Sequence, residues 1–155
     1  MDTRAVIENR LSGQHEVGMT IMLDTPDSIL SRRPASDKWS VFEHFAHLVR
    51  YQHLFIQKVD RILTELNPSI PRYAAENDAA FKSWLQNDKE WQIHQLINDR
   101  FAVYNQFLEF TDQILKKPGT HPVYGRLTLM EWHEFFVLHE AHHLHAMWKM
   151  SKMTL

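Results

Sequence analysis

The sequence predicts an all-α protein built as an antiparallel four-helix bundle, and two observations lead to this fold class. Four segments carry apolar residues at the spacing of an α-helix, and breaks that contain proline or glycine separate them. No alternating polar and apolar run is long enough to indicate a half-buried strand. With 155 residues, 44% of them hydrophobic, the chain is expected to form a single domain over residues 1–155.

The first two predicted helices occupy residues 3–23 and 40–66. The first ends ahead of Pro26, because proline cannot continue the interior of a helix. Ser40, followed three residues later by Glu43, forms the capping-box pattern that begins a helix. Two prolines soon after residue 66 end the second helix.

The second half of the chain is predicted to add one short helix and two long ones. A long connection contains the short helix, near residues 77–84. Asp88, or the asparagine before it, caps a third long helix that runs to about Lys117, where a Pro-Gly pair closes it. Thr128 begins the fourth long helix, and Glu131 completes a second capping box.

Composition and charge exclude several classes of protein. The 17 basic and 19 acidic side chains leave a formal charge of −2, which provides no attraction toward nucleic acid or anionic lipid. The chain has no cysteine, so disulfides and thiolate metal ligands are excluded. No segment approaches the roughly 18 apolar residues that a membrane-spanning helix needs, and the first residues lack an apolar signal region. We therefore expect a cytoplasmic protein.

Histidine is frequent, with 11 in 155 residues, and six of them lie within residues 121–145. His139 and His143 are one turn apart and face the apolar side of the fourth helix. Buried imidazoles need partners for both ring nitrogens, so a core normally avoids two of them together. The same i, i+4 spacing lets two ring nitrogens bind one metal ion. Histidines that hydrogen-bond within the core are the alternative interpretation.

A third ligand would come from the second helix, which carries His44 and His47. The helical wheel favours His44, because this residue lies closer to the centre of the apolar stripe. His47 lies at the margin of that stripe beside Tyr51, where a site could remain open to solvent. The spacing of residues therefore leaves the choice between the two histidines open.

Two segments resemble the DinB/YfiT-like metalloproteins, which are four-helix bundles with a three-histidine metal site. Residues 38–48, KWSVFEHFAHL, are similar to the family's entry into its second helix. Residues 121–144 are similar to its His-Pro…Gly-x-Leu-Thr segment and its terminal His-x-x-x-His pair. The resemblance implies that His47, His139 and His143 bind the metal. It also implies zinc, nickel or iron as the ion, homodimers, and activity as a metal-dependent hydrolase or a thiol S-transferase.

Three neutral imidazoles leave a divalent ion its full charge and an open coordination position, as in catalytic sites. We therefore expect a divalent-metal enzyme that acts on a small-molecule substrate, as a hydrolase or a low-molecular-weight-thiol S-transferase. A non-catalytic metal- or small-ligand-binding stress-response module is the alternative. Glu43 and Glu140 are candidate catalytic residues, although the capping box already accounts for Glu43.

Other side chains are expected to have structural roles. Tyr51 and Tyr73 are predicted to pack as partly buried aromatic residues. A second apolar stripe on the fourth helix, which includes Val137, Leu144 and Trp148, predicts a contact within the chain or a homodimer. Histidines without a paired spacing are expected at the surface or at its edge: His15, His53, His94, His121 and His133.

Overall fold

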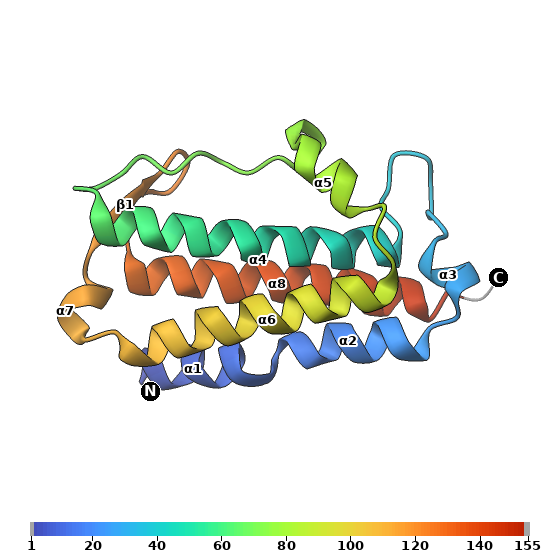
Figure 1. The fold of residues 1–155 in the computed structure, drawn as a ribbon, viewed down its shortest axis with the longest axis horizontal. Coiled ribbons are helices and arrows are strands. Elements are labelled where there is room, and N and C mark those ends of the chain that lie inside the picture. The colour runs from blue at the N-terminus through green and yellow to red at the C-terminus, as the bar shows by residue number, and fades with distance from the viewer. Residues whose placement is uncertain (1, 154–155) are drawn as a thin grey trace.

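The computed structural model describes residues 2–153. Four long helical stretches lie side by side in it (Figure 1). The predicted all-α four-helix bundle is therefore confirmed. Among the described residues, no helix is both long and apolar enough to cross a bilayer. The bundle consists of α1 (Thr3–Gly13) continued by α2 (His15–Asp24), α4 (Val41–Thr64), α6 (Lys89–Glu109) and α8 (Leu129–Ser151).

Both predicted capping boxes are present, and they begin α4, which carries His47, and α8, which carries His139 and His143. The Ser40 hydroxyl accepts from the backbone N–H of Glu43, and the Glu43 side chain accepts from the backbone N–H of Ser40. Thr128 and Glu131 exchange the same two hydrogen bonds at the start of α8. Each pair satisfies two amide donors that the first helical turn leaves without partners, which explains where α4 and α8 begin.

The first predicted helix is interrupted after Gly13, and α2 starts at an offset from α1 (Figure 1). The Gln14 side-chain amide donates to the carbonyl oxygen of Val137 and to the carboxylate of Glu140, each at 2.8 Å. These contacts tie the break to the middle of α8. The interruption is therefore set by the contact with α8 as well as by the low helix propensity of glycine.

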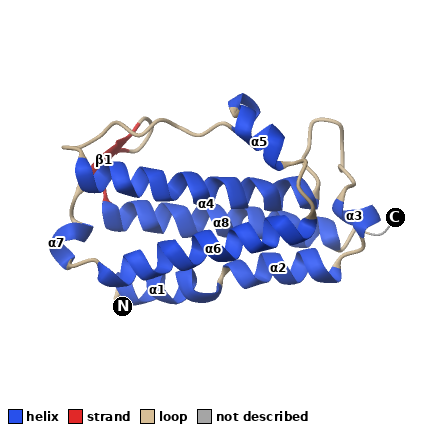
Figure 2. Ribbon diagram, in the orientation of Figure 1, coloured by secondary structure: helices blue, strands red, loops and turns tan. Residues whose placement is uncertain are grey.

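Several short elements connect the long helices. The hairpin of two short strands forms at one end of the bundle (Figure 2) and was not predicted, because four-residue strands are too short for a clear alternating pattern. The third long helix was predicted to reach Lys117 but ends at Glu109, since the Thr111 side chain caps a new short helix. These elements are α3 (Asp27–Leu30), the 3₁₀ helix η1 (Ala75–Asn77), α5 (Ala79–Trp84), α7 (Asp112–Leu115), β1 (Pro118–His121) and β2 (Gly125–Thr128).

The long connection between α4 and α6 returns along the bundle, so these two packed helices run in the same direction within a bundle that was expected to be antiparallel (Figure 1). In contrast, α8 runs antiparallel to α4. His44 near the start of α4 contacts His143 near the end of α8, and Phe55 farther along α4 packs on His133. The antiparallel pair α4–α8 therefore brings the histidines of the two helices to the same level.

The second apolar stripe of α8 is largely covered within the chain. Val137 and Leu144 are buried, and α8 packs against both α1 and α2. Gly18 of α2 lies so close to Leu144 that a Cβ there would stand 2.9 Å from the leucine side chain. Trp148, at the end of the stripe, remains 51% exposed. The stripe is thus explained by contacts within the bundle, and a homodimer remains a prediction.

Candidate metal centre

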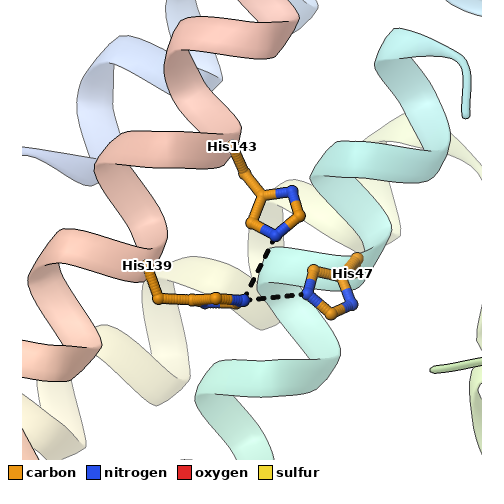
Figure 3. A group of neighbouring side chains, drawn as sticks. All are labelled: His47, His139 and His143. Carbon is orange, nitrogen blue, oxygen red and sulfur yellow. Dashed lines mark hydrogen bonds between the residues drawn. The ribbon is translucent and has the colours of Figure 1, made fainter. Parts of the chain in front are cut away.

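Three histidines from two helices converge in the bundle (Figure 3). His139 and His143 lie one turn apart on α8, and His47 faces them from α4. The Nε2 atom of His139 lies 3.2 Å from the Nε2 atom of His47 and 3.2 Å from that of His143. One ring nitrogen from each histidine lies within 4.8 Å of the others. The i, i+4 spacing on α8 and the antiparallel packing of α4 produce this convergence.

The spacing of these nitrogens suits a divalent metal ion. A tetrahedral ion with metal–nitrogen distances of about 2.0–2.1 Å separates its ligand nitrogens by about 3.3 Å. The two measured separations of 3.2 Å agree with that value. A neutral imidazole has one donor and one acceptor nitrogen, so three nitrogens turned toward one another are difficult to satisfy without an ion. The donor set therefore fits a divalent metal.

Burial keeps the three imidazoles neutral. Loss of solvation, together with neighbouring positive charge, lowers the pKa of His47 to about 3, that of His139 to about 4 and that of His143 to about 2. All three rings are therefore unprotonated at pH 7. Their lone pairs are available to a metal ion without competition from protons.

Aromatic packing holds the His47 and His139 rings in place. Tyr73 stacks on His47 with ring centroids 5.5 Å apart, and Tyr51 packs on His139 at 4.1 Å. Trp39 covers His47 from another side at 4.9 Å. Because the Nδ1 atoms of both histidines have no hydrogen-bond partner among residues 2–153, these contacts determine the ring orientations.

The structure brings His47 to the α8 pair and gives His44 a different place. The Nδ1 atom of His44 lies 2.8 Å from the Nδ1 atom of His143, on the side of the His143 ring away from the cluster. The helical wheel favoured His44 and left the choice open, whereas the family resemblance pointed to His47, which is the residue that lies with the α8 pair. A wheel describes one helix alone, whereas the residue that faces the pair depends on how α4 packs against α8.

Neither candidate carboxylate belongs to the histidine cluster. Glu43 caps α4 and accepts from the Arg33 guanidinium, with a distance of 2.9 Å from Nε to Oε2. Glu140 is 3% exposed and therefore does not lie at the solvated surface. Its carboxylate pairs with the buried guanidinium of Arg100 and accepts from Gln14. Both glutamates therefore have structural partners away from the three imidazoles.

A cavity of about 330 Å³ lies against the cluster, and His47 and His139 form part of its wall. Tyr51 and Tyr73, which were expected only to pack, also line this cavity. Its volume lies at the small end of the range for ligand sites, about 300–1,000 Å³. The remaining lining residues are Lys58, Pro71, Arg72, His121, Val123, Tyr124, Trp132 and Phe135.

Lys58 and Arg72 also line the cavity, although their sequence pattern did not predict a place in the site. Lys58 lies eleven residues after His47 on α4, which is close to three full turns, so helical spacing could have placed it on the same face. Arg72 lies in the connection after α4, and no periodic pattern locates it. That connection is tied to the hairpin, since the backbone N–H of Ile70 donates to Thr120 at 2.9 Å.

Two histidines that were expected at the surface or its edge are buried. His133 is 1% exposed and packs between Phe55 and Phe107, and its Nδ1 atom lies 2.7 Å from the carbonyl oxygen of Leu129. His121 is 6% exposed, and its Nδ1 atom accepts from the two backbone N–H groups of the hairpin turn. Local backbone groups satisfy these rings, which allows their burial without a paired histidine.

Comparisons with known proteins agree with this architecture. The profile of the DinB superfamily matches residues 15–147. The solved structure of YfiT from Bacillus subtilis is similar over 96% of this chain and 86% of that chain, with a TM-score of 0.84 and 20% sequence identity. No curated protein sequence matched the chain. The match to the profile covers most of the bundle and shows that the chain belongs to the DinB superfamily.

Proposed function

We propose that the protein binds one divalent metal ion through His47, His139 and His143 and uses it to hydrolyse a small molecule. The observation that carries this proposal is the convergence of three neutral imidazoles beside a cavity of about 330 Å³. YfiT, which has the same fold, is described as a probable metal-dependent hydrolase, and this supports the proposed reaction. Zinc, nickel and iron(II) are all compatible with imidazole ligands.

His47, His139 and His143 would hold a divalent ion as neutral ligands, and such an ion would supply the chemistry of activating water or polarising a carbonyl group. His47 and His139 contribute to the cavity wall, so a substrate in the cavity would lie beside the proposed centre. Tyr73, Tyr124 and Phe135 line the same cavity and would shield a bound substrate from bulk water. The small volume of the cavity therefore favours a small substrate.

The chain fixes the position of Tyr73 over the proposed centre. The Tyr73 hydroxyl donates to Asp78 at 3.0 Å, and Arg50 binds the same carboxylate at 2.8 Å. Asp78 also caps α5, so its position is tied to the backbone. These hydrogen bonds hold the Tyr73 ring against His47 and thereby limit the rotation of that imidazole.

Metal content and hydrolysis test the proposal together. Protein purified without a histidine tag is loaded in turn with zinc, nickel and iron(II), and bound metal is measured by elemental analysis. Each form is then assayed with small esters and amides, and with a low-molecular-weight thiol plus an electrophile. We expect one ion per chain and hydrolysis of at least one ester or amide. The variant His47→Ala is expected to lose both, because two imidazoles bind metal much more weakly than three.

The matched control is His145→Ala, which removes an exposed histidine from the helix that carries the α8 pair. This variant is expected to keep the metal and the rate. Substoichiometric metal in the wild-type protein would contradict the metal site. Full metal content with thiol transfer but no hydrolysis would replace the hydrolase by a transferase, and metal without any turnover would indicate a binding module.

A further inference from the structure

The cavity beside the three histidines contains two cationic side chains and no carboxylate. Lys58 on α4 and Arg72 on the connection after it both line the cavity. No aspartate or glutamate is among the lining residues within the described part of the chain. Among residues 2–153, neither cation has a carboxylate oxygen within 4.0 Å. The cavity therefore carries positive charge that the chain itself does not neutralise.

Lys58 is held within the cavity wall. Its Nζ atom lies 4.5 Å from the centre of the Tyr51 ring, a cation–π contact. The cavity that Lys58 lines is also lined by His47, His139 and His121, so the ammonium group shares the cavity with these imidazoles. Burial lowers the pKa of Lys58 itself to about 8, so the group is still mainly protonated at pH 7.

Arg72 brings a second positive charge from a different element. Its segment is tied to the hairpin by Ile70, and by the parallel bridge between Ser69 and Thr120. Arg72, Lys58 and His121 all line the same cavity. Burial, and then the charges of Lys58 and Arg72, lower the pKa of His121. Because one cation comes from a helix and the other from a loop fastened to the hairpin, the fold itself brings the two charges together.

Tyr51 adds an unused donor beside these charges. The residue is 4% exposed, and its hydroxyl has no hydrogen-bond partner among residues 2–153. A buried hydroxyl without a partner destabilises the fold unless a bound group satisfies it. A partly buried ammonium group without a counter-ion destabilises the fold more strongly than such a hydroxyl does. These groups share one preference, for an anionic oxygen acceptor.

We propose that the substrate carries an anionic oxygen group, such as a carboxylate, and that Lys58 and Arg72 bind this group inside the cavity. That the bound molecule is a substrate rests on the proposed function, whereas the anion site itself needs no metal. Aromatic side chains form much of the remaining wall, including Tyr73, Tyr124 and Phe135. The two features together select a small molecule with an apolar body and one anionic end.

Benzoate and benzamide provide a matched pair of probes, since they have similar size and shape and differ in charge. Isothermal titration calorimetry near neutral pH measures both on metal-free and on zinc-loaded protein. We expect metal-free wild-type protein to bind benzoate at least tenfold more tightly than benzamide, as for a charge-assisted hydrogen bond. Binding by the metal-free form separates the anion site from the metal, because zinc could itself attract a carboxylate.

Substitutions assign the preference to the two cations. Lys58→Gln is expected to weaken benzoate binding about tenfold and to leave benzamide binding unchanged, because only the charged contact is lost. Arg72→Gln is expected to act in the same direction with a smaller effect, because Arg72 is exposed. Lys58→Arg retains the charge and should restore most of the preference. Lys116→Gln, an exposed lysine that does not line the cavity, controls for net charge.

Equal affinities for benzoate and benzamide in the wild-type protein would overturn the inference. A preference that survives both Lys58→Gln and Lys58→Met would do the same, and circular dichroism verifies that each variant is folded. A protein that prefers benzoate but binds no zinc would refute the proposed metal function and leave the anion site standing. Zinc binding without any benzoate preference would refute the anion site alone.

Discussion

The buried pair of Arg100 and Glu140 lies in the middle of the bundle and predicts a large loss of stability in Glu140→Gln. Both residues are 3% exposed. Arg100 also donates to the Gln52 side chain at 2.6 Å and to the carbonyl oxygen of Leu11 at 3.3 Å. The substitution keeps the size of the side chain and removes its charge, which leaves the buried guanidinium without a counter-ion.

The expected loss in the free energy of unfolding is about 3–5 kcal/mol, the range for a buried ion pair that loses one partner. This is a large part of the roughly 5–15 kcal/mol that stabilises a domain. For a chain of this size it corresponds to a decrease in Tm of roughly 6–20 °C. Zinc affinity is expected to remain within about threefold, because the carboxylate points to Arg100 and not to the three imidazoles.

Urea unfolding followed by circular dichroism measures the stability, and a zinc competition titration measures the affinity. The paired variant Arg100→Met with Glu140→Met is the control, since it removes both charges at once. It should be less destabilised than Glu140→Gln, although Gln52 and Gln14 then lose hydrogen-bond partners. Unchanged stability together with a large loss of zinc affinity would show that Glu140 serves the metal centre, and would refute the structural role.

Two further predictions concern histidines outside the proposed ligand set. His44→Leu is expected to weaken zinc binding about ten- to a hundredfold, because the His44 side chain contacts the His143 Nδ1 atom at 2.8 Å and helps to orient that ring. A competition titration measures the affinity, and an unchanged value would show that His44 does not orient His143. His133→Phe is expected to reduce the loss of stability that metal-free protein shows as the pH falls. Burial lowers the pKa of His133 from 6.5 to about 4 in the folded protein, so between these pH values the imidazole is protonated in the unfolded chain and neutral in the folded one. Protonation therefore favours the unfolded chain, and the free energy of unfolding decreases. Between pH 7 and pH 4.5 the variant should lose about 2–3 kcal/mol less than wild type in urea unfolding, and an identical loss would contradict this.

Much of the helical framework was predictable because its signals are local. Ser40 and Thr128 cap their helices through contacts within a few residues, and both helix starts were located correctly. The pairing of His139 with His143 on one face of α8 follows from 3.6 residues per turn, which also needs no knowledge of the fold. Where such a local signal was weak, as in the four-residue strands of the hairpin, the prediction failed.

The choice between His44 and His47 shows what local patterns leave open. The two residues lie on neighbouring faces of α4, and the one that meets the α8 pair depends on the packing of the two helices. The presence of Arg72 in the cavity depends likewise on long-range backbone hydrogen bonds between its segment and the hairpin. The amino-acid sequence was therefore sufficient to predict the four long helical stretches, the capping boxes of α4 and α8, and the histidine pair, but not the break after Gly13 or the end of α6 at Glu109. Residue spacing left the third histidine open, although the family resemblance pointed to His47. The geometry that joins His47 to the α8 pair and the charge of the cavity required the folded chain, because contacts between elements far apart in sequence place those groups.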